Sequence, residues 1–227
     1  MLFFFLSSSI GFLPSGPYLC SKRNSTTPHT QLLLLHSLRN DVMWFNNWIP
    51  DLVCTKVEDL TKLEVEMRKK IIKGHIFLKK NFPTFENSFV LDTASQTGTR
   101  GSRRLTGEYV ITKEDFQNSK KFDDTIAVFP RLGLPGEAEV KRVYIPFRAL
   151  VPEKVDGLLV AGRSFSSDFT ANNIANLIPH CIAMGQAAGT VAVMAVQQNI
   201  APRKVDSHAL QQKLVKQGVV LPGIEII

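Results

Sequence analysis

The sequence contains few cysteines, and no two of them are close together. Cys20, Cys54 and Cys181 are the three cysteines in 227 residues. Zinc sites and iron–sulfur clusters are usually built on closely spaced cysteines, and disulfide frameworks need several pairs. The sequence therefore argues against a disulfide framework and predicts no metal site.

Acidic residues are scarce relative to basic ones. The chain has 20 Asp and Glu against 27 Lys and Arg, a formal charge of +7. This balance favours anionic partners: a nucleic acid, a diphosphate cofactor or an acidic substrate. No helix-turn-helix, zinc-finger or RNA-binding signature accompanies the charge, so we expect no nucleic-acid partner. A hydrophobic content of 44% and a charged content of 21% are typical of a globular protein.

The first 50 residues show no clear periodicity, and we expect an irregular segment there. Residues 1–13, MLFFFLSSSIGFL, are apolar but too short to span a membrane, and no basic residue precedes them as in a signal peptide. We favour a cytoplasmic location and keep a secretory signal as the alternative. The other alternative to a leader, and the one that we prefer, is a truncated or mis-started chain.

Residues 61–80 predict an amphipathic helix. Thr61 and Glu64 have the spacing of a capping box. Apolar residues follow at helical intervals, which predicts one inward face: Leu63, Met67, Ile71 and Leu78. The other face carries a basic cluster, which we interpret as solvated because Glu66 interrupts it: Arg68, Lys69, Lys70, Lys73, Lys79 and Lys80.

Residues 82–112 predict two short strands, at 89–91 and 108–112, joined by an arginine-rich turn. Arg100, Arg103 and Arg104 could bind a carboxylate or phosphate through paired hydrogen bonds, or could form surface ion pairs. Thr112 and Asp115 then have the spacing of a helix cap, for a helix reaching about residue 122. An irregular stretch follows to residue 136, and 140–152 predicts a strand that runs into a stiff loop.

Residues 143–198 are the most informative stretch. Residues 157–161, GLLVA, predict a buried strand that ends at Gly162. A polar loop follows, and then an apolar helix beginning near Pro179, with Asn176 as its N-cap. A glycine turn beside a helix N-terminus can bind an anion, because unpaired N–H groups and the positive end of the helix dipole point at it.

Three further patterns belong to this helix and the next. His180 and Cys181 are adjacent and so point in different directions, which favours packing over a catalytic pair. Gly185 and Gly189 have the GxxxG spacing that lets a helix approach a neighbour closely. This apolar helix is long enough to cross a membrane, but its polar residues favour a core helix.

The apolar helix ends at Asn199, and a last helix follows it. We expect Asp206 to cap this last helix, Leu210 and Leu214 to face inward, and Gly218 to end it.

Three segments resemble the C-terminal part of the FAD-dependent oxidoreductase family, within the glutathione-reductase-like flavoproteins. They are YIPFRALVP (144–152), GLLVAGRSFSSD (157–168) and IPHCIAMGQAAGTVA (178–192), with weaker similarity from residue 51. The resemblance implies FAD as cofactor and a final strand and helix that close the flavin site. It implies five cofactor-binding candidates: Gly162, Arg163, Ile178, Pro179 and Gly185.

The resemblance also implies a fold and a domain organisation. We expect an α/β protein, α+β within this chain, in which residues 141–227 form the C-terminal part of a Rossmann-like FAD-binding domain. Residues 51–140 would belong to a substrate or cap region. Arg100, Arg103 and Arg148 are the candidates for binding a small-molecule substrate, and Arg148 could instead pair with Glu153 or Asp156. No catalytic residue is assigned, and the oligomeric state stays open.

The sequence departs from the family pattern in several places. Arg163 follows the glycine where many relatives have an acidic residue, and Phe169 and Asn176 stand where many have histidine and arginine. The GxGxxG motif that holds the ADP half of FAD in such proteins does not occur. We therefore expect a C-terminal fragment of an FAD-dependent oxidoreductase. The alternative is a non-catalytic remnant or interaction module that no longer binds FAD; a nucleic-acid binder would rest on charge alone.

Overall fold

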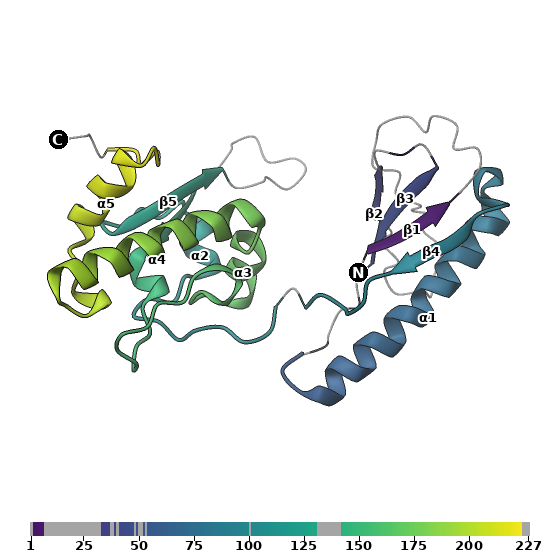
Figure 1. The fold of residues 1–227 in the computed structure, drawn as a ribbon, viewed down its shortest axis with the longest axis horizontal. Helices are drawn as coiled ribbons and strands as arrows, with labels where there is room; N and C mark the ends of the chain where they lie inside the picture. Colours follow the sequence, from purple (N-terminus) through teal and green to yellow (C-terminus); the bar gives the residue numbers. More distant parts are fainter. Residues whose placement is uncertain are drawn as a thin grey trace. The chain divides into compact units, whose positions relative to one another are not determined.

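The computed structural model describes residues 2–6, 33–36, 39, 41–47, 49, 52, 54–99, 101–130 and 142–223. Contacts within the chain divide it into two compact units, Met1–Thr99 and Arg100–Ile227 (Figure 1). Each unit has a hydrophobic core of its own. The functional roles that we predict for residues 51–140 and 141–227 stay predictions.

The first unit is built on an antiparallel sheet of four strands in the order β2-β3-β1-β4. Its central strands β1 (Leu2–Leu6) and β3 (Val42–Asn46) pair with each other, and β2 (Leu33–His36) and β4 (Phe89–Thr93) lie at the edges. β4 confirms the strand predicted at 89–91. The other three strands lie in residues 1–50, where we expect irregular chain. β1 pairs with segments far along the chain, β2 and β3 pair with each other, and none of the three shows a periodicity that predicts it.

Helix α1 (Val57–Asn81) packs against this sheet (Figure 1) and is followed by the 3-10 turn η1 (Pro83–Phe85). The predicted inward face is confirmed, since its four apolar residues are buried. Three of them, Met67, Ile71 and Leu78, form a cluster with Met43, Phe45 and Phe85. The predicted start is wrong. The helix begins four residues earlier, and the Thr61 hydroxyl donates to the Val57 carbonyl within it, at 2.9 Å. Glu58 and Asp59 occupy the first turn, where acidic side chains stabilise a helix dipole.

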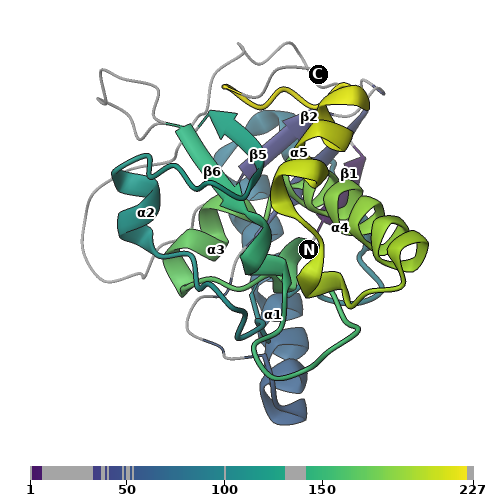
Figure 2. The same cartoon turned by 90° about the vertical axis from the view of Figure 1, so that its left-hand side faces the viewer.

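The second unit contains an antiparallel ribbon of β5 (Thr125–Pro130) and β6 (Arg142–Pro146), followed by the 3-10 turn η2 (Phe147–Leu150). β6 confirms the strand predicted within 140–152, whereas β5 lies where we expect irregular chain. Helices α4 (Ile178–Gln198) and α5 (Ser207–Lys216) pack against β5, and α2 (Lys113–Gln117) packs against β6 (Figure 2). The predicted capping box of Thr112 and Asp115 is present, but α2 ends five residues earlier than expected.

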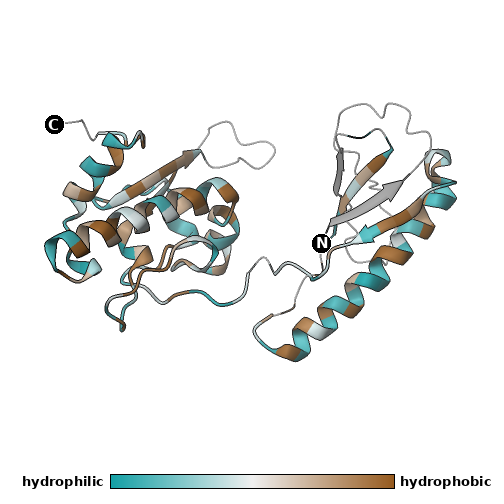
Figure 3. Ribbon diagram, in the orientation of Figure 1, coloured by the Kyte–Doolittle hydropathy of each residue, from teal (hydrophilic) through white to brown (hydrophobic). Residues whose placement is uncertain are grey.

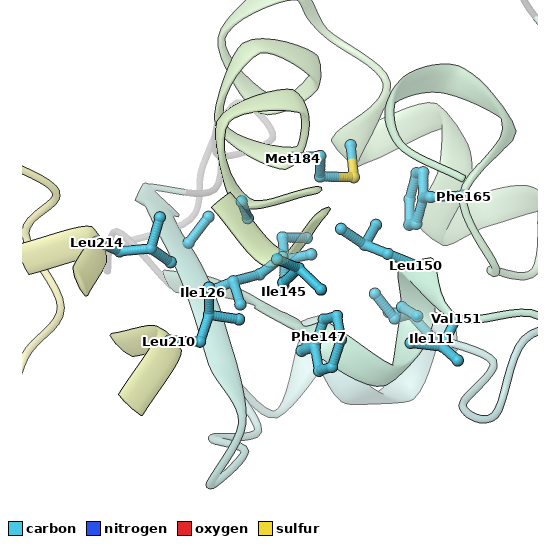
Figure 4. Close-up of a cluster of buried hydrophobic side chains, with 14 of the residues drawn as sticks. Ile111, Ile126, Ile145, Phe147, Leu150, Val151, Phe165, Met184, Leu210 and Leu214 are labelled. Atoms are coloured by element: carbon cyan, nitrogen blue, oxygen red, sulfur yellow. The ribbon is translucent and has the colours of Figure 1, made fainter. Parts of the chain in front are cut away.

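The core of this unit joins the ribbon to its helices. Leu210 and Leu214 of α5 lie on one side of Ile126 and Ile145, and Met184 of α4 lies on another (Figure 4). Three predicted helix signals are confirmed: the left-handed Asn199 ends α4, Asp206 caps α5, and Gly218 follows α5 with a φ of +92°. The chain as described is α+β, a mixture of helices and small antiparallel sheets.

Candidate functional site

Residues 157–161 lead into the candidate site as an extended segment. The predicted strand is absent. Among the described residues, the segment makes one backbone hydrogen bond to a neighbouring segment, from Val160 N–H to the Leu150 carbonyl at 2.8 Å. A strand needs a partner along several residues, and the described neighbours offer one contact. Leu158 is 47% exposed, so the apolar run is also less buried than we expect.

Gly162 begins the short 3-10 turn η3 (Gly162–Ser164) with a φ of +78°. Only glycine adopts this conformation without strain. A Cβ at this position would lie 3.9 Å from the Cβ and Sγ atoms of Cys181, in ordinary contact. The backbone dihedral, rather than lack of space, therefore requires glycine, and the turn lies directly against the first turn of α4.

Helix α3 (Phe169–Ala175) occupies the segment that we expect to be a loop. Asp168 is its N-cap, and the Asp168 carboxylate accepts from the backbone N–H groups of both Ala171 (2.7 Å) and Lys113 (2.6 Å). The buried Asn172 donates to the Arg163 carbonyl at 2.9 Å and to the Ser167 hydroxyl at 3.3 Å. These polar contacts fix the turn that carries Arg163.

The N-terminus of α4 lies beside this turn and carries no side-chain cap. The prediction that Asn176 caps it is wrong: the N-cap is Leu177, and Asn176 is the C-cap of α3. The other α-helices of this unit are each capped by a side chain, from Thr112, Asp168 and Asp206. Pro179 lies in the first turn, and Ile178 and Ile182 are 76% and 66% exposed. An open helix end bordered by apolar side chains suits a planar apolar group with an electron-rich edge.

His180 and Cys181 point in different directions, as adjacent helical residues do. The His180 ring is buried against Phe129, with ring centroids 4.1 Å apart, and its Nδ1 has no hydrogen-bond partner among the described residues. Burial lowers the pKa of His180, so the ring is neutral near pH 7. Burial raises the pKa of the Cys181 thiol above its ordinary value, and the opposing effect of the positive charge on Arg163 is smaller. The thiol therefore stays protonated, which supports the packing interpretation of both residues.

The predicted arginines are in different surroundings. Arg100 lies outside the described residues, and Arg103 is exposed. The Nε atom of Arg104 donates to the Ser167 carbonyl at 3.1 Å, which brings this arginine to the loop after Gly162. Arg148 pairs with Asp124 and not with Glu153 or Asp156, and its Nε lies 3.0 Å from the Asp124 carboxylate.

The sequence did not predict the contacts of two residues that hold this loop, Arg203 and Gly107. Arg203 forms ion pairs with Glu108 and Asp156 and donates to the Pro152 and Val155 carbonyls. Gly107 lies so close to Ser166 that a Cβ there would be 2.8 Å from the Ser166 Cβ. The partners are 95 and 59 residues apart for Arg203–Glu108 and Gly107–Ser166, so no local pattern could have revealed them.

The outer surface of α4 carries Gly185 and Gly189. Both glycines are exposed, and no atom of the described part of the chain lies within 4 Å of a Cβ built at either one. By length and composition, α4 is the one helix among the described residues that could cross a membrane. Buried core helices meet the same criteria, and seven residues of α4 are buried.

The comparison with protein families decides the assignment. A family model described as FAD dependent oxidoreductase matches residues 18–214. The chain belongs to the FAD-dependent oxidoreductase family. This confirms the predicted family and its cofactor, FAD. No curated protein and no solved structure matches the chain.

The candidate site can be tested against the cofactor of the FAD-dependent oxidoreductases. Gly162 at positive φ, the open N-terminus of α4 and the exposed Ile178 and Ile182 fit the flavin end of FAD. Arg163, beside them, offers a positive charge to an anionic oxygen. The sequence holds no GxGxxG motif, so the adenosine diphosphate end has no recognisable counterpart in it.

Proposed function

We propose that residues 157–185 form the flavin end of an FAD site in an oxidoreductase that acts on a small-molecule substrate. Gly162, Arg163, Ile178, Pro179 and Gly185 would hold the cofactor. The observation that carries this proposal is the uncapped N-terminus of α4 next to Gly162 at φ +78°. When bound, FAD supplies the redox chemistry, and the chain supplies position and electrostatic field.

Each of these residues has a distinct role in the proposal. The first turn of α4 directs its positive dipole end toward the flavin edge that gathers negative charge. Ile178 and Pro179 provide an apolar contact for the ring, and Gly162 lets the backbone approach it. Gly185 lies two turns along the helix, where the absence of a side chain leaves room beside the ring. Arg100, Arg103 and Arg148 are the candidates for binding substrate, and Arg148 would have to leave its ion pair with Asp124 to do so.

We further propose that the chain corresponds to the C-terminal portion of a glutathione-reductase-like flavoprotein. Residues 141–227 would then be part of a Rossmann-like FAD-binding domain, and residues 51–140 part of a substrate or cap region. A GxGxxG unit supplied elsewhere would hold the adenosine diphosphate end. The proposal includes no nucleic-acid partner and no membrane span.

Absorption spectroscopy tests the proposal directly. We expect the purified chain, incubated with FAD and passed through gel filtration, to retain a visible flavin band. Gly162→Ala strains the backbone of the turn, because a φ of +78° is unfavourable for alanine, and it should weaken FAD binding about tenfold or more. Gly157→Ala is the matched control, because Gly157 also has a positive φ (+69°) and lies in open space.

The outcomes separate the main alternatives. A retained band that Gly162→Ala weakens and Gly157→Ala leaves unchanged supports the proposed site. A band that both variants leave unchanged would move FAD elsewhere on the chain. A colourless protein would contradict self-sufficient FAD binding. It would leave two candidates: a fragment whose GxGxxG unit is supplied elsewhere, and a remnant or interaction module, which the missing GxGxxG motif and the residues Phe169 and Asn176 favour.

A further inference from the structure

Helix α1 carries a second apolar face that its core contacts do not use. Val65, Ile72 and Ile76 are 46%, 54% and 48% exposed. Successive residues of a helix turn by about 100°, so these three lie on the side opposite Met67 and Ile71, which face the sheet. They form a row roughly 16 Å long, at about 1.5 Å per residue. Figure 3 shows hydrophobic and hydrophilic residues alternating along α1.

The same part of α1 has a one-sided charge. Residues 67–81 contain six Lys and Arg and no Asp or Glu. The acidic residues of the helix all precede this segment, and two of them pair with its first two basic residues: Glu64 with Arg68 at 3.2 Å, and Glu66 with Lys69 at 2.9 Å. The last turns of the helix, about four in residues 67–81, therefore carry an excess of positive charge.

The charge and the apolar row occupy one face. By helical spacing, lysines 69, 73 and 80 border the row of Val65, Ile72 and Ile76, and all three lysines are exposed. A lysine side chain can lay its apolar stem along such a row while its ammonium group points outward. We name these six residues the outer face of α1: Val65, Lys69, Ile72, Lys73, Ile76 and Lys80.

We propose that the outer face of α1 binds the surface of an anionic phospholipid bilayer. The helix would lie along the membrane, with the aliphatic row among the headgroups and the lysines on lipid phosphates and carboxylates. A nucleic acid would contact the lysines and leave the isoleucines against a charged backbone. Aliphatic side chains between lysines therefore favour lipid over nucleic acid.

Vesicle co-sedimentation of the purified full chain tests this inference. We expect binding to vesicles with equal parts of phosphatidylcholine and phosphatidylserine, weakened by salt, and little binding to phosphatidylcholine alone. The variant K69Q/K73Q/K80Q should lower the partition coefficient about a hundredfold, since each lysine near an anionic surface contributes several-fold. The control K154Q/K204Q/K216Q removes the same charge from exposed positions in residues 100–227 and should bind like the wild type.

A second variant tests the aliphatic row. I72Q/I76Q keeps the charge and the helix propensity, and it should lower vesicle binding about tenfold while circular dichroism stays unchanged. Vesicle binding that I72Q/I76Q leaves unchanged would overturn the proposal, as would equal losses in the two lysine variants or no dependence on phosphatidylserine. Tighter binding to duplex DNA than to these vesicles would reassign the face to nucleic acid.

Discussion

The Asp124 carboxylate holds Arg148 by three hydrogen bonds. Oδ2 accepts from the Arg148 backbone N–H at 2.9 Å and from Nε at 3.0 Å, and Oδ1 accepts from Nη2 at 3.1 Å. The guanidinium also lies 5.5 Å from the centre of the Tyr109 ring. Asp124 lies just before β5 and Arg148 just after β6, so this pair joins the two strands at one end of the ribbon.

We expect Asp124→Asn to destabilise residues 100–227 by about 1–3 kcal/mol, the usual cost of losing hydrogen bonds between charged groups. Arg148→Lys should lower the free energy of unfolding by about 1 kcal/mol, because lysine keeps the charge but cannot donate two parallel hydrogen bonds to the carboxylate. Hydrogen exchange of the backbone amides in β5 and β6 measures both. Asp123→Asn, at the exposed neighbouring position, is the control and should change stability by no more than about 0.5 kcal/mol. Equal effects of the Asp123 and Asp124 variants would contradict a structural role for the pair.

A second prediction concerns the close approach at Gly107. A Cβ there would lie 2.8 Å from the Ser166 Cβ and 2.9 Å from the Val151 carbonyl oxygen. Because backbone must move to admit it, Gly107→Ala should destabilise the unit by about 1–3 kcal/mol in urea unfolding. Gly189→Ala, in an open position of α4, should stabilise it by roughly 0.5–1 kcal/mol. A neutral Gly107→Ala variant would show that the approach is looser than described.

A third prediction follows from the double use of Asp168. Its carboxylate accepts from the backbone N–H groups of Ala171 in α3 and Lys113 in α2, whereas Asp206 accepts from Ala209 alone. Asp168→Ala should therefore cost about 2 kcal/mol and Asp206→Ala about 1 kcal/mol. Thermal unfolding followed by circular dichroism compares the two, and a smaller loss for Asp168→Ala would contradict the double cap.

The parts of the fold that the sequence predicted are those with local causes. The inward face of α1, the capping box at Thr112, the cap at Asp206 and the end of α4 at Asn199 each depend on residues within one or two turns. The missed strands lack such local signals. β1 pairs with β3 and β4 far along the chain, and β2 and β5, although each pairs with the next strand, show no alternation of polar and apolar residues that would predict them.

Part of the backbone around the candidate site was predictable, for a different reason. Gly162 signals a backbone conformation and the apolar run 178–198 signals a helix, so the turn and the helix could be placed in sequence order. The interactions that hold the turn could not. Asn172 donates to the Arg163 carbonyl only because α3 forms in what reads as a polar loop. Arg104 reaches Ser167 across 63 residues. Propensity carries no information about such pairs.

The last prediction concerns the buried His180. Burial lowers its pKa below the ordinary value of 6.5, so the folded chain resists protonation at this ring. Above that value both the folded and unfolded chains are neutral there, and the group has no effect on the pH dependence of stability. As the pH falls below it, the unfolded chain binds a proton that the folded chain does not. Stability should therefore decline between about pH 6.5 and pH 5.5, by up to roughly 1 kcal/mol from this group.

His180→Phe should remove this decline and keep the contact with Phe129. Urea unfolding of residues 100–227 at several pH values between about 7 and 5 measures it, above the range where most carboxylates titrate. His208→Gln removes a histidine from an exposed position of α5 and should leave the decline unchanged. If His180→Phe keeps the full pH dependence, the ring is already protonated or solvated in the folded chain. Its unpaired Nδ1 would then face water rather than the core between α4 and β5.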